Sequence, residues 1–149
     1  MANQYAVNHT KRHVTVPAKL TDVATQGGRV RVLHDTFVTA TTIDQTEILF
    51  GKLPPGAKVW EFAMRISGTL GSNSALEAGY TGATTAFLAN AASTSATTRY
   101  MMGAATAATL APVTITTESD VVVKYDPSSG TTAATNGVTI TVWALYTLD

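Results

Sequence analysis

The sequence predicts one all-β domain, an antiparallel β-sandwich of about eight strands preceded by an extended arm. Apolar and polar residues alternate with a period of two over residues 57–67 and again over 138–148, as in half-buried strands. Turn signals containing proline or glycine separate the alternating runs. Threonine, a β-branched residue that favours strands, occurs 27 times in the 149 residues. This length suits a single domain.

The run 57–67 contains the clearest predicted strand. Trp60, Phe62, Met64 and Ile66 alternate with the other residues of the run and are predicted to form the principal core face. Leu53-Pro54-Pro55-Gly56 precedes it and cannot continue a strand, because proline lacks the N–H that a ladder needs.

The C-terminal run 138–148 is apolar on both alternating faces, because Trp143 and Leu145 fall opposite the other apolar residues. We therefore expect both of its faces to be covered. Turns are predicted at 126–130 and at Asn136-Gly137. A short helix is predicted at 84–92, capped by Thr84 or Thr85. Further strands are predicted at 29–33, 36–40, 47–52, 69–76, 113–117 and 121–125, and the total of about eight suits a jelly-roll-like sandwich.

The sequence divides into an arm, residues 1–28, and a sandwich body, residues 29–149. The arm has weak periodicity and ends in a Gly27-Gly28 hinge. Residues 1–34 carry five basic residues against one aspartate, a net charge of +4, whereas residues 35–149 carry five basic and nine acidic residues, −4. These charges predict docking onto an acidic protein surface and, less favoured, onto nucleic acid. The candidate contact residues are Lys11, Arg12, Lys19, Arg29 and Arg31.

Residues 71–117 contain only Glu77 and Arg99 as charged residues. A monomer in water rarely keeps so long a stretch nearly uncharged, because charge keeps surfaces soluble and separate. With the two apolar faces of 138–148, this stretch predicts a homotrimer whose interface lies near these segments.

No catalytic site, metal site or cofactor site emerges from the sequence, and no enzyme is expected. The chain has no cysteine, which excludes disulfides and thiol chemistry and suits a cytosol-like compartment. His34 and Asp35 are neighbours, but adjacent strand residues point to opposite faces and form no dyad. His9 and His13 have the spacing of a helical metal pair, yet no helix is predicted there. No apolar run is long enough for a membrane-spanning helix.

Three features in order resemble small structural proteins of tailed bacteriophages. Residues 48–66 place an apolar strand, a Leu-Pro-x-Gly-Ala turn and an alternating strand in succession. Residues 75–82 followed by 86–89 are similar to a "Leu-x-x-Gly-x-x-Gly…Phe-Leu" stretch of these proteins. The chain ends in a β pair split by a Gly/Thr turn. The resemblance covers residues 43–149 and not the arm.

The resemblance implies a capsid decoration, or cement, protein: a jelly-roll-like sandwich, often trimeric, bound to the outside of the head. Its partners would be the major capsid protein and further copies of itself, and it would assemble on virions in the host cytoplasm. Such a protein has no catalytic residues. The main alternative is a phage tail, fibre or adhesion component, although no repeats or glycine-rich shafts are present. A carbohydrate-binding sandwich is less favoured, because its exposed row of aromatic residues is not expected here.

Overall fold

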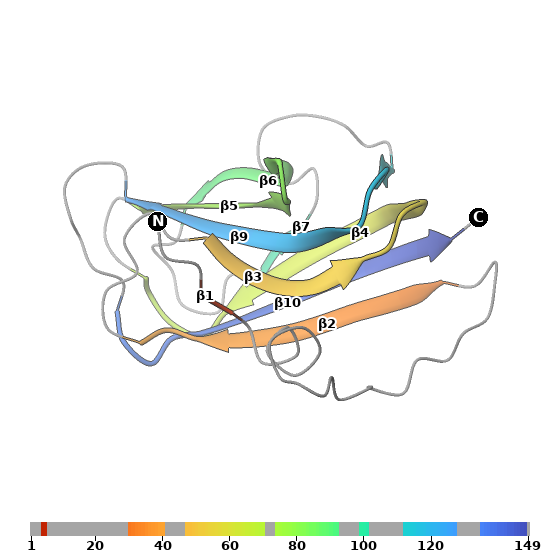
Figure 1. The fold of residues 1–149 in the computed structure, drawn as a ribbon. Coiled ribbons are helices and arrows are strands. Elements are labelled where there is room, and N and C mark those ends of the chain that lie inside the picture. The colour runs from red at the N-terminus through yellow and green to blue at the C-terminus, as the bar shows by residue number, and fades with distance from the viewer. Residues whose placement is uncertain are drawn as a thin grey trace.

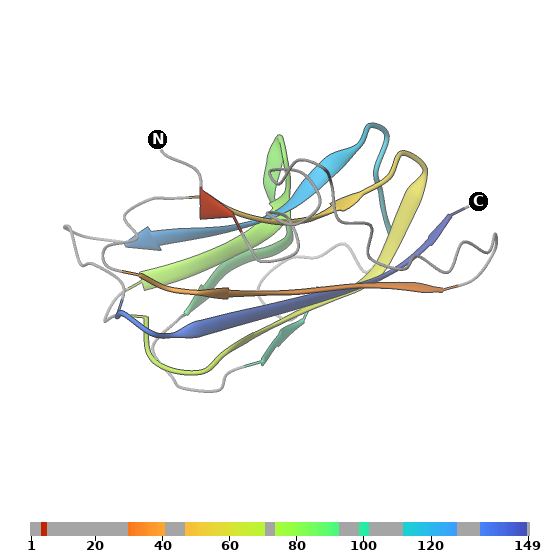
Figure 2. The same ribbon diagram turned by 60° about the horizontal axis from the view of Figure 1, so that its bottom comes forward.

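The computed structural model describes residues 4–5, 30–40, 47–70, 74–92, 99–101, 112–127 and 135–148, all of them in strands, turns or extended segments. The two sheets form separate layers, best seen in Figure 2. Two strands have only two residues, β1 (Gln4–Tyr5) and β8 (Val113–Thr114). The main strands are β2 (Arg31–Val38), β3 (Glu47–Leu53), β4 (Ala57–Ile66), β5 (Ser74–Tyr80), β6 (Ala83–Ala92), β7 (Arg99–Met101), β9 (Ser119–Pro127) and β10 (Thr139–Leu148).

The eight main strands form a jelly roll, as the sequence predicted. One sheet has the order β3-β9-β5-β6, with β1 added beside β3, and the other has the order β2-β10-β4-β7, with β8 paired to β4 (Figure 1). Each early strand pairs antiparallel with a late one: β2 with β10, β3 with β9, β4 with β7 and β5 with β6. This nested pairing, first strand with last, rolls the chain into two facing four-stranded sheets.

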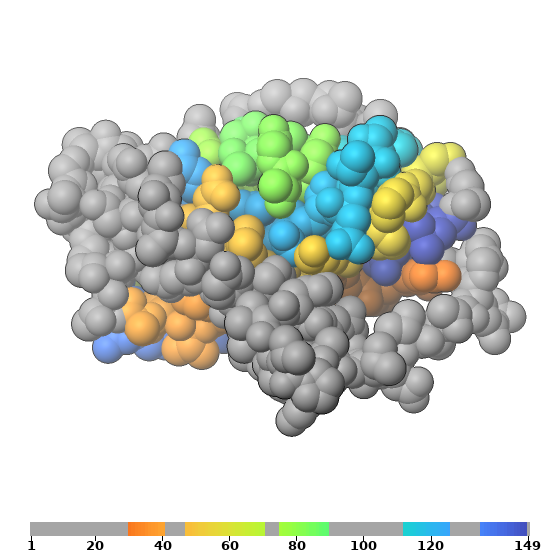
Figure 3. All heavy atoms as spheres, viewed as in Figure 1, coloured from red at the N-terminus to blue at the C-terminus, as the bar shows by residue number. Residues whose placement is uncertain are grey.

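The core lies between the two sheets and is built from the inward residues of both. Figure 3 shows β9 lying between β3 and the β5–β6 pair on the viewed side. Tyr125 is fully buried, and its hydroxyl donates a hydrogen bond of 3.3 Å to the carbonyl of Leu70, so the ring brings no unsatisfied polar group into the core. The rings of Phe62 and Phe87 stack across the layers with centroids 5.2 Å apart.

The predicted core face of β4 is right for Phe62, Met64 and Ile66, which are fully buried, and wrong for Trp60, which is 55% exposed. The physical reason is a β-bulge: Leu145 pairs with Glu61, whereas the next residue, Tyr146, pairs with Val59. The extra residue, Trp60, shifts the alternation by one, so Val59 enters the core and Trp60 turns outward.

The helix predicted at 84–92 is wrong, because these residues form strand β6. Thr81 and Gly82 make a two-residue turn between β5 and β6, and Gly82 has φ +91°. Alanine favours helix only weakly, and here pairing with β5 and burial of Phe87 and Leu88 override that preference.

Strand β6 is strongly irregular beside Gly79. The five steps from Ala83 to Leu88 match only two steps of β5, from Ala78 to Tyr80. The surplus chain folds back over Gly79, where a Cβ would overlap the Ala83 carbonyl oxygen and lie 2.7 Å from the Thr84 carbonyl carbon. Only glycine allows such a close backbone approach.

Several predicted strands differ in extent from the observed ones. The strands predicted at 29–33 and 36–40 are one continuous strand, β2, and the strand predicted at 69–76 begins later, at Ser74. The strands predicted at 47–52, 121–125 and 138–148 are confirmed as β3, β9 and β10. The short β7 was not predicted.

At one end of the sandwich, Thr39 connects β2 to the segment before β10 by hydrogen bonds. It follows β2 and is 1% exposed. Its hydroxyl donates to the Thr135 carbonyl at 2.7 Å and accepts the Val138 N–H at 2.9 Å. At the opposite end, the proline turn before β4 is held by Gly56 N–H donating to the Ile115 carbonyl at 2.7 Å. Through Thr39, the end of β2 and the segment before β10 are joined by side-chain hydrogen bonds in addition to the ladder between the two strands.

Part of the predicted arm also has a place in this fold. Gln4 and Tyr5 pair in parallel with Ile48 and Leu49 of β3, so these two residues add a short strand to the sheet of their own chain. The remaining arm residues, 1–3 and 6–28, lie outside the described residues.

Phe62→Ala is expected to lower the free energy of unfolding by about 3–5 kcal/mol, the range for truncating a buried phenylalanine. The matched variant, Trp60→Ala on the same strand, should cost less than about 1 kcal/mol, because this side chain is largely exposed. Urea melts of both variants measure the difference. Equal losses would contradict the bulge and the register of β4.

Gly79→Ala is expected to lower the free energy of unfolding by about 1–3 kcal/mol or more, because the added Cβ must displace backbone atoms of β6. Gly68→Ala is the control, since its Cβ would lie 3.3 Å from a side-chain atom, Cγ2 of Val138, and would meet no backbone atom within 4 Å. Thermal unfolding followed by circular dichroism compares the two. A Gly79 variant as stable as the Gly68 variant would show that β6 does not fold over this position.

Candidate interaction surfaces

The predicted basic contact residues are placed only in part. Arg31 is the first residue of β2; it is half-buried and lies on the same side of the strand as Leu33 and Phe37. Its Nε is buried, so this side chain does not lie on the outer face of the sheet. The other four, Lys11, Arg12, Lys19 and Arg29, lie outside the described residues, so their grouping with Arg31 stays a prediction.

His34 and Asp35 point to opposite sides of β2, as expected for adjacent residues of a strand. His34 is exposed on the outer face. Asp35 is 2% exposed on the inner side, where its Oδ1 accepts the Thr36 N–H at 2.8 Å. The two side chains therefore cannot act together on one bound molecule.

The described segments contain no cluster of three or more histidine, aspartate or glutamate side chains suited to holding a metal ion. No helix within the same segments is long and apolar enough to cross a membrane.

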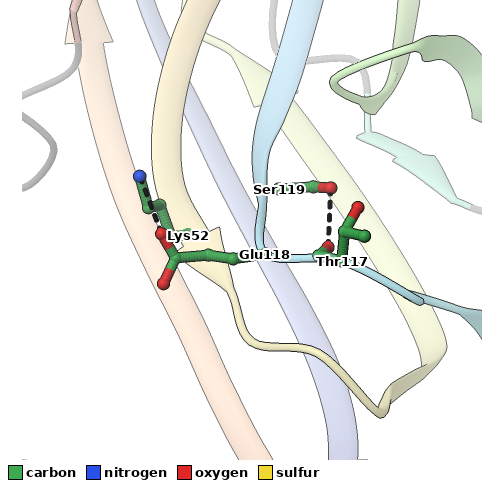
Figure 4. A network of polar contacts seen from close by, with 4 residues as sticks. All are labelled: Lys52, Thr117, Glu118 and Ser119. Atoms are coloured by element: carbon green, nitrogen blue, oxygen red, sulfur yellow. Dashed lines mark hydrogen bonds and ion pairs between the residues drawn. The ribbon is translucent and has the colours of Figure 1, made fainter.

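The outer face of the β3-β9-β5 sheet carries paired charges. Lys124 Nζ lies 3.8 Å from Glu77 Oε2 across β9 and β5. Lys52 Nζ donates to Glu118 Oε1 at 2.9 Å in Figure 4. This hydrogen bond raises the pKa of Lys52 above its ordinary value, and partial burial opposes the shift.

The same segment is fixed by Ser119, whose hydroxyl donates to the Thr117 carbonyl at 2.9 Å, also drawn in Figure 4. Between the charged rows, Leu49 is only 9% exposed and Val122 is fully buried, although both point away from the core. Gly79, the partner of Val122, is the residue over which β6 folds back. This face is therefore largely covered by its own chain.

The outer face of the β2-β10-β4 sheet is different, and we call it the open face. It consists of the residues of these strands that point away from the core, together with Val30, which precedes β2. Its large exposed apolar side chains are Val30 at 64%, Val32 at 62%, Val38 at 57% and Trp60 at 55%. Val32 pairs with Leu145, and Leu145 pairs with Glu61 beside Trp60, so Val32 and Trp60 lie toward one end of this face, whereas Val38 lies toward the other. Exposed apolar patches mark contact surfaces more often than free surface.

Trp60 is held in place on the open face. Its indole Nε1 donates to Thr147 Oγ1 at 2.9 Å across β4 and β10. The ring is thereby oriented before any partner arrives, which reduces the entropy lost on binding.

Both faces of β10 are apolar, as predicted, and they differ in burial. Ile140, Val142 and Ala144 are fully buried in the core. Trp143 and Leu145 lie on the open face and are half-buried.

The exposed valines and Trp60 were not singled out as contact residues from the sequence. The sequence did contain a signal for the bulge at Trp60. The charged residues Lys58 and Glu61 are three positions apart, so an unbroken strand would place them on opposite faces and would direct one of them into the core. In the structure both point outward, because the bulge lies between them. For the valines no sequence signal exists, since exposed and buried valines in a strand differ only in what the folded chain packs over them.

No family model matches this chain, and no curated protein matches it. Three solved structures have chains of similar fold. A chain of the cyanophage Pam1 capsid asymmetric unit aligns with 91% of this chain and 96% of its own length, at 22% identity and a TM-score of 0.61. A chain of the Ralstonia phage GP4 capsid aligns with 89% of this chain and 93% of its own, at 17% identity and a TM-score of 0.64.

The third similar chain belongs to the acid-stable capsid of the Helicobacter pylori bacteriophage KHP30. It aligns with 83% of this chain and 90% of its own length, at 16% identity and a TM-score of 0.54. In all three cases the alignment covers nine-tenths or more of the similar chain. The likeness therefore concerns the complete fold of small capsid chains rather than a shared fragment.

Proposed function

We propose that this chain is a non-catalytic structural protein of a bacteriophage virion, bound to the outside of the head, where it cements the joints between capsid subunits. The observation that carries the proposal is the similarity of the whole jelly roll to chains of three phage capsids. The resemblance of residues 43–149 to small phage structural proteins supports the same function from the sequence.

The surfaces also suit a cementing function. Binding energy at a subunit joint comes from buried area and strand addition rather than from chemistry. The open face offers exposed valines and an oriented tryptophan, and tryptophan is a common centre of binding energy in interfaces.

The proposed partners are the major capsid protein and further copies of this chain. The arm, residues 1–28, would lie on an adjacent acidic protein surface, with Lys11, Arg12 and Lys19 steering docking and Arg29 and Arg31 continuing the basic charge. Assembly onto heads would take place in the host cytoplasm. Neither a membrane nor a nucleic acid is part of this proposal.

The full chain should co-sediment with purified heads that lack it and should not co-sediment with isolated tails. This distinction separates a head protein from a tail or fibre component, because each presents a different partner surface. Binding to tails alone would contradict the head assignment.

In the same assay, a chain lacking residues 1–20 should fold and no longer bind heads. The deletion removes β1 and leaves the eight main strands complete. As a length-matched control, the triple variant Lys11→Gln, Arg12→Gln, Lys19→Gln should bind more weakly and with less dependence on salt, because it lacks the charges that steer docking. If the truncated chain bound heads as tightly as the full chain, the arm would have no part in docking.

Light scattering of the full chain at low micromolar concentration should give three times the mass of one chain. The nearly uncharged stretch 71–117 and the second apolar face of β10 are the reasons for this expectation. A folded, soluble monomer would contradict the trimer.

A further inference from the structure

The charges on the outer face of the β3-β9-β5 sheet are unequal in number. In one row, Lys124 of β9 is the register partner of both Glu47 of β3 and Glu77 of β5. Its Nζ lies 3.8 Å from Glu77 Oε2. One ammonium group balances only one of the two carboxylates, so this row has one positive and two negative charges, a net charge of −1.

The second row has the same surplus. Lys52 of β3 lies opposite Asp120 of β9, and it donates a hydrogen bond of 2.9 Å to Glu118, directly before β9 (Figure 4). The pKa of Lys52 is raised, first by this hydrogen bond and also by the negative charge of Asp120, whereas partial burial opposes the shift. The two rows together carry two positive and four negative charges, a net charge of −2, and we call them the acidic face.

The opposite side of the sandwich does not share this surplus. Among the described outward residues of the open face, the charged ones at neutral pH are Lys58, Glu61 and Arg65, which sum to +1. A basic segment is therefore attracted to the acidic face and not to the open face.

The arm is attached to the same sheet at its start. Tyr5 pairs with Leu49, which lies on β3 between the two charged rows. The pairing is parallel, so the chain runs past Tyr5 in the direction of Lys52. Lys11 follows after a stretch of chain that can span about 20 Å, whereas β5 lies only about 10 Å from β3. Lys11 and Arg12 can therefore reach both charged rows.

The arm also ends beside β3. Strand β2 begins at Arg31, and a Cβ on Gly51 of β3 would lie 3.3 Å from Cδ1 of Leu33, near the start of β2. Both ends of the segment 6–29 are therefore attached along one border of the acidic face.

We propose that residues 6–20 of the arm dock on the acidic face of their own chain before the protein binds any partner. This segment contains Lys11, Arg12 and Lys19 and no acidic residue, a net charge of +3 against −2 on the face. The surplus of carboxylates, rather than any single side chain, attracts the segment, because exposed charges contribute little one at a time. Attachment at both ends favours its own face over that of a second copy, since a tethered segment has a high effective concentration.

This inference goes beyond the proposed virion function and does not require it. If the chain does cement heads, the acidic face and the head compete for one arm. The arm must then leave its own chain before it can lie on an adjacent protein. Internal docking would also keep free copies from binding one another through their arms.

Limited trypsin digestion tests this docking, because the segment can be cleaved after Lys11, Arg12 and Lys19. A docked segment is cleaved only while it is released. At low salt, cleavage of the full chain at these sites should be about tenfold slower than cleavage of a synthetic peptide of residues 1–28, a factor that a few exposed ion pairs together can supply. The difference should shrink as salt is raised, because exposed charges are screened.

The double variant Glu47→Gln, Glu118→Gln locates the contact. It removes two carboxylates with little change in side-chain size and brings the net charge of the acidic face from −2 to zero. Its arm should be cleaved within about twofold of the peptide rate, because the charge surplus is gone. Glu61→Gln on the open face is the control and should keep the protection of the full chain. Circular dichroism confirms folding of each variant.

Cleavage of the full chain as fast as the peptide at low salt would overturn the docking, and a double variant as protected as the full chain would overturn its place. Protection that increases with protein concentration would show docking between copies instead of within one chain, which also overturns the proposal. Head binding takes no part in this assay, so failure of the virion proposal and failure of this one are told apart.

Discussion

The ladder between β2 and β10 is the contact on which the rest of the sandwich depends. Eight consecutive pairs join segments about a hundred residues apart, from Val38–Thr139 to Arg31–Tyr146. Because β10 also pairs with β4, it lies at the centre of its sheet and sets the position of both neighbours. The nested pairs of β3 with β9 and β5 with β6 then build the second sheet opposite. Thr39 reinforces this ladder where the two strands meet at its end.

Consecutive strands β3 and β4 belong to different sheets, and each contains a bulge near the turn that connects them. On β3, three steps from Leu49 to Lys52 match two steps on β9, and on β4 the extra residue is Trp60. Each bulge shifts the alternation of its strand by one residue, so the residues flanking the proline turn, Leu53 and Ala57, both reach the core. The exposure of Trp60 is thus a consequence of how the hairpin crosses between the layers.

The fold class could be predicted from sequence because alternation and turn residues are local signals. Phe62, Met64 and Ile66 lie in a regular part of β4, and there the alternation predicts burial correctly. It fails at Trp60, since the bulge depends on pairing with a strand some 85 residues away. The helix predicted at 84–92 fails for a related reason: alanine content is local, whereas the irregular pairing of β6 with β5 is not.

The candidate surfaces were less predictable than the fold. Arg31 was identified by its charge, but its half-buried place at the end of β2 follows from the facing sheet and not from its neighbours in sequence. The open face could not be recognised, because Val32 and Val38 have the same apolar character as core valines such as Val142. Which valines remain exposed is decided by what the folded chain packs over each strand face.

The central position of β10 has a consequence for synthesis on the ribosome. All its partners precede it in the chain, so β2 and β4 are made before the strand that separates them in the finished sheet. During translation the backbone edges and apolar residues of β2 and β4 that pair with β10 have no partner strand. The sheet can be completed only after β10 has emerged from the ribosome. We therefore expect the β2-β10-β4-β7 sheet to be completed late, and the nascent chain to be most vulnerable to aggregation just before β10 is available.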